Sequence, residues 1–381
     1  MKNTNKKGFT IVELVIVIAV IAILAAVLIP TFASIVKKAQ QSADYQAVAQ
    51  MNKILTAAQA TDSLIVEGDD AQSSINIYKA LIAEGYSYEF DAYYAKYDFG
   101  YVVENGNAVI VLVEDGKVVV PKDYEGETNY KPFFIAVENA DDLLAAFDTG
   151  YVLMKTDAVF TETIGISDDI TIVGNQKLLN DSDISYDSAA NSIININGAS
   201  ENIAVNMSGL TISKEREQAY ARGINLGNNT GKVTLVLDDV DVESYYYALN
   251  ITASNAGGVD IIVRNSKITG WTALNVWSKV NVTFENCVLS GNDRSTSNEN
   301  FGTIVINAEE DGSKAAGSTF TFKNCTIEAN TSTNNPNMNM VDVRANATLT
   351  FEGCTFKVNG NEVDALTQNV EDGVVATITV K

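Results

Sequence analysis

The sequence predicts a chain of mixed class, in which a long amino-terminal helix and a small antiparallel sheet precede a right-handed parallel β-helix. Three observations support this prediction. An apolar stretch continues into an alanine-rich amphipathic segment, Asn-Gly and Asp-Gly pairs separate short apolar runs, and the carboxyl-terminal part repeats itself about every 21–38 residues. For 381 residues, two or three domains are expected.

The composition excludes several classes of function. The chain has 48 acidic and 26 basic residues, a formal net charge of −22, and no histidine. Such an acidic chain is repelled by nucleic acids and anionic lipid surfaces, so no nucleic-acid partner is expected. Without imidazole, histidine-based catalytic triads and histidine metal sites are excluded. No cofactor and no metal site are predicted.

The first element is a hydrophobic segment over residues 9–29. Of its 21 residues, Thr10 and Glu13 are the two polar ones. As a helix it is roughly 31 Å long, enough to cross a bilayer core of about 30 Å. A carboxylate in such a place costs about 2–3 kcal/mol even on the lenient insertion scales, so Glu13 needs a positively charged partner.

Three interpretations of this segment compete. A secretory signal would have a shorter apolar run and a small-residue cleavage site soon after it, which this sequence lacks. A plain membrane anchor explains the length and the flanking lysines but leaves Glu13 unexplained. In the third interpretation, a cut between Gly8 and Phe9 frees an α-amine, which meets Glu13 of a neighbouring, axially staggered helix.

The stretch "KKGFTIVELVIVIAVIAILAAVLIPTF" resembles the amino terminus of type IV pilins and pseudopilins. Gly8 ends a basic leader (residues 1–8), Phe9 is the first mature residue, Glu13 the fifth and Pro30 the twenty-second. The resemblance implies cleavage after Gly8 and N-methylation of Phe9 by a prepilin peptidase. It also implies assembly with other pilin-like subunits through the helix, in which Glu13 and Pro30 take part. It covers about the first 60 residues closely and the next 70 less closely.

The amphipathic helix continues to residue 62, with a kink expected at Pro30, because apolar residues recur at three- and four-residue steps. A head follows over residues 63–132. Within it we expect a short helix over residues 73–85 and a three-stranded antiparallel meander over about 93–120. Asn105-Gly106 and Asp115-Gly116 supply the positive φ angles that its tight turns require.

Residues 133–381 form the predicted β-helix, because short alternating segments align with one another. The pattern resembles the pectate-lyase-like superfamily over about residues 139–379. One column of the alignment holds residues that tolerate left-handed backbone, so we expect a bend and a structural side-chain ladder there: Gly209, Asp239, Asn265, Asn286, Asn324 and Gly353. The preceding, outward-facing column alternates in charge: Asp238, Arg264, Glu285, Lys323 and Glu352. Such alternation predicts a stabilising row of ion pairs.

The three cysteines, Cys287, Cys325 and Cys354, fall in one inward-facing column. Two explanations are open: buried free thiols, or a disulfide between adjacent rungs. We favour three buried thiols, because Val240 and Ser266 occupy the same column in earlier rungs.

A ligand-binding face is predicted from aromatic residues that precede the third strand of several rungs. Its candidate residues are Tyr246, Trp271, Phe301 and, nearby, Trp277. Stacked aromatic faces bind sugar rings, so a glycan or another cell-surface ligand is expected; the alternative is an internal aromatic stack. An adjacent column, also taken as outward-facing, offers amides to hydroxyl groups or stacks on itself: Asn195, Asn225, Asn250 and Asn275, continued by Val305 and Asp342.

Catalysis is not expected. A sugar-cleaving site needs two carboxylates that face one cleft. The segment "LDDVDVES" offers Asp238, Asp241 and Glu243 as outward-facing candidates, but Arg264 is already assigned to the charge column beside Asp238.

The sequence therefore predicts a membrane-stored, surface-displayed filament subunit whose β-helix serves adhesion or carbohydrate binding. The alternatives are a pseudopilin of a secretion or DNA-uptake system and a surface-tethered polysaccharide lyase or hydrolase.

Overall fold

The computed structural model describes the chain except residues 1–10, 62–75, 79, 82, 85–91, 133–134, 138–142, 145–146, 148–149, 155, 175–176, 181–191, 215–220, 253–254, 294–301, 308–314 and 334. The chain divides into two units. The first consists of Met1–Val66 and Asn76–Phe133, and the second of Glu67–Ile75 and Phe134–Lys381.

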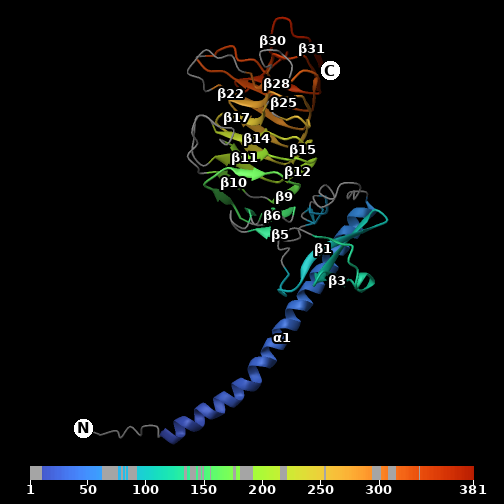
Figure 1. Cartoon of the computed structure of the whole chain (residues 1–381), viewed down its shortest axis with the longest axis vertical. Helices are drawn as coiled ribbons and strands as arrows, with labels where there is room; N and C mark the ends of the chain where they lie inside the picture. The colour runs from blue at the N-terminus through green and yellow to red at the C-terminus, as the bar shows by residue number, and fades with distance from the viewer. Residues whose placement is uncertain are drawn as a thin grey trace, which may run out of the picture. The chain divides into compact units, whose positions relative to one another are not determined.

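The first unit is built on one long helix, α1 (Ile11–Ala60), drawn in blue in Figure 1. Alanine and unbranched residues dominate its second half, and no glycine interrupts it. The helix continues through Pro30, although proline leaves the carbonyl four residues earlier without its helical donor. Beyond Pro30, α1 becomes a core helix, because Val48, Met51 and Leu55 are fully buried.

A four-stranded antiparallel sheet packs on the second half of α1, with the strand order β3-β2-β1-β4. Its strands are β1 (Asp98–Glu104), β2 (Asn107–Glu114), β3 (Lys117–Val120) and β4 (Lys131–Pro132). The predicted turns are confirmed: Asn105 and Gly106 have φ angles of 52° and 78°, and Asp115 and Gly116 have 50° and 75°. The predicted meander began too early, since its first strand starts at Asp98 and not near residue 93.

The short helix expected over residues 73–85 is helical at residues 76–78, 80–81 and 83. Its side chains Ile77 and Leu81 are fully buried. Gly85, expected to end it, lies outside the described residues.

The second unit contains three large sheets in which, apart from one hairpin, all neighbouring strands are parallel. The nine-stranded sheet holds β7 (Ala158–Phe160), β10 (Lys177–Asn180), β13 (Thr211–Lys214), β16 (Asp241–Glu243), β19 (Lys267–Gly270), β22 (Val288–Asn292), β25 (Thr326–Asn330), β28 (Thr355–Val358) and β29 (Asn361–Val363). The eight-stranded sheet holds β8 (Ile164–Ile166), β11 (Ser192–Asn197), β14 (Arg222–Gly227), β17 (Tyr247–Ile251), β20 (Thr272–Val276), β23 (Ile304–Ile306), β26 (Val341–Val343) and β30 (Gln368–Val370). The ten-stranded sheet holds β5 (Ile135–Val137), β6 (Tyr151–Met154), β9 (Ile170–Gly174), β12 (Ile203–Ser208), β15 (Val233–Asp238), β18 (Val259–Arg264), β21 (Val280–Glu285), β24 (Ser318–Lys323), β27 (Ala347–Glu352) and β31 (Ala376–Val380).

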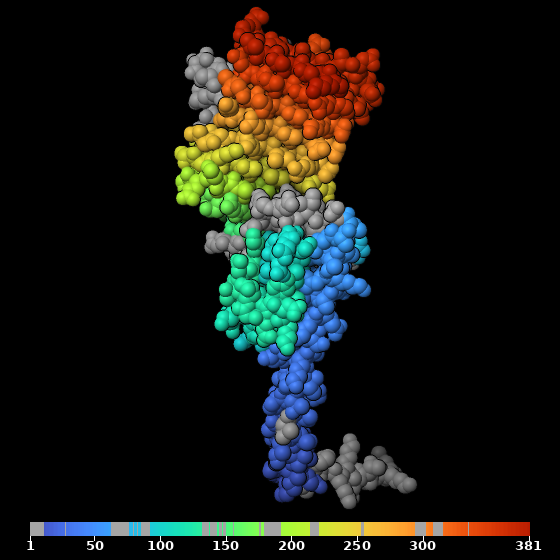
Figure 2. Space-filling model, turned by 90° about the vertical axis from the view of Figure 1, so that its right-hand side faces the viewer, coloured from blue at the N-terminus to red at the C-terminus, as the bar shows by residue number. Residues whose placement is uncertain are grey.

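From β7 to β28, consecutive strands enter the three sheets in rotation, and every third strand lies beside its predecessor in the same sheet. Figure 1 shows the result as stacked turns of chain from β5 to β31. In Figure 2 the colours of this unit follow one another in bands from green to red. Each turn of the chain therefore lies mostly next to the turns that precede and follow it in the sequence. The long helix, the small antiparallel sheet and the large parallel region agree with the predicted fold class at this level.

Inward-facing side chains of all three sheets form one apolar cluster that extends from Val137 to Phe356. It contains the predicted inward column of the nine-stranded sheet in register: Ile212, Val242, Ile268, Leu289, Ile327 and Phe356. Alternation of buried and exposed positions along strands such as β21 follows from the period of two in a strand.

Candidate functional site

The residues expected to act in assembly lie at the start of α1. Glu13 is in its first helical turn and Pro30 is inside it, while Gly8 and Phe9 lie outside the described residues. A negative charge in the first turn is favoured by the helix dipole. The positions of Glu13 and Pro30 agree with a continuous helix through the motif.

The apolar side chains of the first half of α1 are exposed. Ile11, Ile23 and Ile29 keep 81%, 67% and 68% of their accessible surface, and Leu14 and Leu24 keep more than half. Water does not stabilise a continuous apolar surface of this extent, so a lipid phase or other helices must cover it. By length and hydropathy, α1 is the one helix among the described residues suited to cross a membrane.

The second half of α1 is tied to its sheet by polar side chains that sequence analysis missed. The side-chain amide of Asn52 donates to the Ile110 carbonyl at 2.8 Å and accepts from the Ile110 N–H at 2.6 Å. Gln59 Nε2 donates to the Ala108 carbonyl at 3.2 Å. Because the pairing of β3 with β2 reaches only to Leu112, these amides complete the edge of β2 that β3 leaves unpaired.

Asp44, another residue on α1 that sequence analysis missed, is fully buried. Its carboxylate accepts the backbone N–H groups of Tyr93 and Tyr94 at 2.7 and 2.9 Å. These residues precede β1, so a turn replaces the strand that was expected at residue 93.

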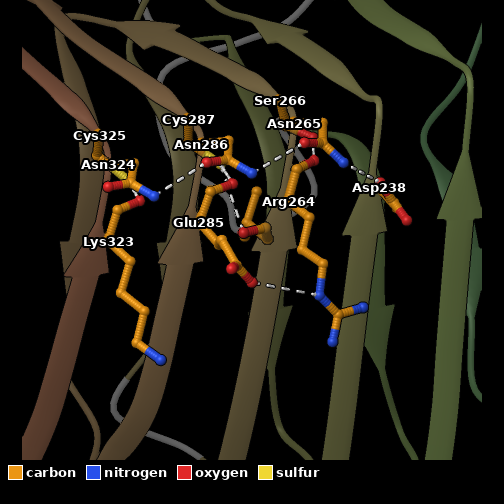
Figure 3. A network of polar contacts seen from close by, with 11 residues as sticks. Asp238, Arg264, Asn265, Ser266, Glu285, Asn286, Cys287, Lys323, Asn324 and Cys325 are labelled. Carbon is orange, nitrogen blue, oxygen red and sulfur yellow. Dashed lines mark hydrogen bonds and ion pairs between the residues drawn. The ribbon is translucent and has the colours of Figure 1, made fainter.

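The register of the predicted charge column is confirmed in the ten-stranded sheet, and one of its neighbouring pairs, Arg264 and Glu285, forms an ion pair. Asp238, Arg264, Glu285, Lys323 and Glu352 are paired in register across β15, β18, β21, β24 and β27. Arg264 Nε lies 4.0 Å from Glu285 Oε2 (Figure 3). Beyond the residues drawn there, Lys381 Nζ lies 3.0 Å from Glu352 Oε1 and extends the row. These pairs are largely exposed, so each contributes little stability.

The predicted bend column is also confirmed. Its six members all have positive φ angles, between 51° and 70°. Asn286 Nδ2 donates to Asn265 Oδ1 at 3.3 Å, and Asn324 Nδ2 donates to Asn286 Oδ1 at 3.5 Å (Figure 3). The ladder therefore combines a backbone requirement with long, weak side-chain hydrogen bonds.

The acidic cluster of "LDDVDVES" is not gathered at one place. Asp238 ends β15 in the ten-stranded sheet, whereas Asp241 and Glu243 lie on β16 in the nine-stranded sheet. Asp238 keeps its place in the outward-facing column but is buried there, and its carboxylate accepts the Asn265 amide at 3.0 Å.

Two of the aromatic candidates, Tyr246 and Trp271, form a compact stack with Tyr247 at the start of β17 and β20. The ring centroids of Tyr246 and Tyr247 are 3.8 Å apart, and those of Tyr246 and Trp271 are 5.2 Å apart. Arg222 lies 5.8 Å from the Tyr246 ring centre, and Trp271 Nε1 donates to Asp293 Oδ1 at 3.1 Å. Tyr246 is half-buried, while Tyr247 and Trp271 are less than one-tenth exposed, which fits the alternative of an internal stack.

The other two aromatic candidates do not join this stack. Trp277 is half-buried and follows β20, so the whole strand separates it from Trp271. Phe301 lies outside the described residues. Of the four candidates, the structure therefore brings together Tyr246 and Trp271.

The neighbouring asparagine column is buried, and the expectation that it faces outward to a ligand is wrong. Asn225, Asn250 and Asn275 are at most 4% exposed. The amide nitrogen of each of these three residues donates to the preceding asparagine in the column at 2.6–2.8 Å, starting from Asn195. The amides thus stack on themselves, as the alternative explanation held, and Val305 and Asp342 continue the register.

Two comparisons with known proteins match the amino terminus. A family described as the prokaryotic N-terminal methylation motif matches residues 3–29. Two proteins of Pseudomonas aeruginosa named fimbrial protein are each 41% identical over 69 residues. The alignment covers 18% of this chain and 41% of each relative, so the chain spans less than half the length of these relatives.

The amino terminus is pilin-like. The matched residues include Gly8, Phe9 and Glu13, and Pro30 follows directly after them. No solved structure matches the chain. The pilin-like segment therefore rests on its motif and on the exposed apolar helix, and the three parallel sheets are described from their own geometry.

Sequence analysis also missed Arg222 and Asp293 beside the aromatic stack. Arg222 begins β14 and Asp293 follows β22, so both occupy the ends of strands. Register would have indicated Arg222, because β14 pairs with β17 and places it one turn before the two tyrosines. No sequence signal pairs Asp293 with Trp271.

Proposed function

We propose that this chain is a type IV pilin-like filament subunit. In this proposal a prepilin peptidase cleaves after Gly8 and methylates the Phe9 amine, and α1 holds the protein in the cytoplasmic membrane before assembly. The observation that carries the proposal is the coincidence of the methylation motif with a helix whose first half exposes its apolar side chains.

In the assembled filament, the first half of α1 is buried among the same segments of neighbouring subunits. The Phe9 amine of one subunit lies against Glu13 of the next and neutralises a carboxylate that is costly to bury. The second half of α1, tied to its sheet through Asn52 and Gln59, stays with the head.

The parallel region is, in this proposal, a right-handed parallel β-helix displayed at the cell surface for adhesion. The rotation of consecutive strands through three sheets supports the β-helix. Tyr246 and Trp277, both half-buried, are the candidate ligand contacts among the described residues, and Trp271 supports Tyr246 from behind. A glycan is the ligand class that such aromatic edges favour.

Display, and not catalysis, is the role proposed for this region. The Asp238 carboxylate is engaged by Asn265, and Arg264 lies toward Glu285 in the charge row. Incubation of the intact protein with polyuronides is expected to release no unsaturated products. Release of such products would favour a surface-tethered lyase.

A Glu13→Ala substitution tests the assembly proposal. Cleavage after Gly8 is expected to stay intact, because Glu13 lies outside the cut bond, while incorporation into filaments falls at least tenfold. Gln46→Ala, on the exposed face of the second half of α1, is the matched control and should assemble normally. Filaments of Glu13→Ala at wild-type abundance would contradict the assigned role of this carboxylate.

A glycan array probed with the intact protein in detergent tests the adhesive role. Binding that Tyr246→Ala or Trp277→Ala reduces, and Gln46→Ala leaves unchanged, would support the proposed face. Glycan binding that neither Tyr246→Ala nor Trp277→Ala reduces would contradict the proposed binding face.

A further inference from the structure

The three cysteines form a continuous column at the start of three successive strands of the nine-stranded sheet. Cys287, Cys325 and Cys354 directly precede β22, β25 and β28. The Thr326 N–H donates to the Cys287 carbonyl and the Thr355 N–H donates to the Cys325 carbonyl, both at 2.8 Å. The parallel ladder thus continues through the cysteines, and the Cα atoms of neighbours lie about 4.8 Å apart.

This spacing falls within the range of about 4.4–6.8 Å that disulfides span between Cα atoms. The side chains also face the same way: Cys287 and Cys325 belong to the buried apolar cluster, and Cys354 packs against it. All three are free thiols in the structure, which agrees with the favoured prediction except that Cys354 is only half-buried.

The sulfur atoms of Cys287 and Cys354 each contact a carbonyl group of the preceding turn. Cys354 Sγ lies 3.5 Å from the Phe322 carbonyl, on the turn that carries Cys325. Cys287 Sγ lies 3.4 Å from the Val263 carbonyl, on the turn that carries Ser266. Each of these sulfur atoms therefore points to the turn before its own. Cys325 lies between the other two cysteines and is hydrogen-bonded through its thiol to both Cys287 and Cys354.

Accessibility singles out Cys354 among the three thiols. Cys287 and Cys325 are each 1% exposed, so a reagent in solution reaches Cys354 first. Hydrogen bonding with Cys325 lowers the pKa of Cys354 to about 7 and also lowers the pKa of the buried Cys287. Hydrogen bonding with Cys287 and with Cys354 raises the pKa of Cys325. Cys354 is thus the one partly exposed thiol whose deprotonation is favoured, and Cys325 lies beside it, which is the arrangement of an attacking and a resolving thiol.

We propose that Cys354 and Cys325 form a thiol–disulfide exchange site that a small disulfide oxidises to a bond between adjacent turns. The Cys354 thiolate attacks one sulfur of the disulfide RSSR, the RS–SR bond breaks, and RS⁻ leaves as Cys354–S–SR forms. Cys325 then gives up its proton and attacks the Cys354 sulfur, which forms the Cys325–Cys354 bond and expels the second RS⁻. Two protein thiols are oxidised and RSSR is reduced to two RSH.

The bond closes residues 325–354 into a covalent loop and fastens the turn that ends in β28 to the turn before it. Cross-linking restricts the unfolded chain, so the oxidised protein is expected to melt at a higher temperature than the reduced protein. Such a bond persists in the oxidising surroundings of an exported protein. Cys287 remains a free thiol, because Cys325 can bond to one neighbour only.

The test uses the intact protein, reduced, freed of reductant and incubated with oxidised glutathione, followed by alkylation of the remaining thiols and peptide mass spectrometry. We expect a peptide pair joined through Cys325 and Cys354, with Cys287 alkylated only after denaturation. Cys325→Ser should stop at glutathione on Cys354 and lose the rise in melting temperature. Cys287→Ser is the matched control, since Ser266 already occupies this column, and it should form the bond in wild-type yield.

Three results would overturn the proposal: retention of all three thiols, a bond between Cys287 and Cys325, or glutathione that remains on Cys354 of the wild-type chain. Failure of the pilin-like assembly proposal would leave this test unchanged, because the reaction depends on the second unit alone.

Discussion

At the scale of single residues, the bends between the ten- and nine-stranded sheets depend on backbone conformation more than on side-chain bonding. Asp239, Asn265, Asn286 and Asn324 all adopt the left-handed conformation that most residues avoid. Their amide ladder is exposed and its bonds are long, so it contributes little. Asparagine is thus favoured here because it tolerates this conformation better than other residues with a Cβ atom.

Substitutions at Asn286 separate these two contributions. Asn286→Ala should lower the free energy of unfolding by about 1–2 kcal/mol, the cost of left-handed backbone for an ordinary residue. Asn286→Gly loses the same amide bonds but adopts positive φ freely, and should cost about 0.5 kcal/mol or less. Urea unfolding measures both, and an equal loss in the two variants would show that the side-chain ladder dominates.

The pKa of Cys354 can be tested by the pH dependence of its alkylation rate. Its alkylation rate by iodoacetamide should rise with pH through about 7, because the Cys325 hydrogen bond lowers the pKa of the Cys354 thiol. Cys325→Ala removes that hydrogen bond, so the rise should move toward the ordinary value of about 8.5. Peptide mass spectrometry between pH 5 and pH 10 measures the rates. A wild-type midpoint near the ordinary value would contradict the assigned contact.

At the scale of elements, α1 serves two environments along its length. Its first half exposes apolar side chains, whereas its second half places Val48, Met51 and Leu55 in a protein core. Where β3 is too short to pair with β2, the side-chain amide of Asn52 hydrogen-bonds to the backbone of Ile110 on β2. The same helix therefore offers a surface for other helices at one end and is fixed to its own sheet at the other.

The Asn52 contact predicts a local loss of stability. Asn52→Ala leaves the Ile110 N–H and carbonyl without their partner and should cost about 1–3 kcal/mol. Amide hydrogen exchange at Ile110 should accelerate, while exchange in β21 of the other unit stays unchanged. Gln46→Ala, on the exposed face of α1, should change unfolding by less than about 0.5 kcal/mol. Unchanged exchange at Ile110 would show that the Asn52 bonds are dispensable.

Much of the ladder architecture could be predicted, because aligned repeats fix register and register brings residues such as Arg264 and Glu285 together. The burial of outward-facing positions could not be predicted from the sequence. Alternation along a strand tells which side a residue faces but not what covers that side. Asn225 and Asp238 were expected to face outward, and nothing in the sequence indicated that they would be buried. The Asn52 contact was missed because one asparagine on a helix gives no periodic signal. The unpaired edge that Asn52 completes follows from the structure, in which β2 has 8 residues and β3 has 4.

At the scale of the whole molecule, the proposed function combines two structural parts in one chain, the pilin-like helix and the region of parallel sheets. The pilin-like helix supplies attachment by a motif of fixed spacing, and the parallel sheets supply a body whose turns are held by repeated ladders. Each part can be tested without the other, since a defect in Glu13 leaves the ladders intact and oxidation of Cys354 leaves the motif intact.

The most direct test is the mass of the mature amino terminus, isolated from cells that assemble the protein. The proposal predicts a first peptide that begins at an N-methylated Phe9, with Gly8 and the leader removed. A mature protein that still begins at Met1, or one cut beyond Pro30, would contradict it, because neither supplies an amine that can meet Glu13 of the next subunit.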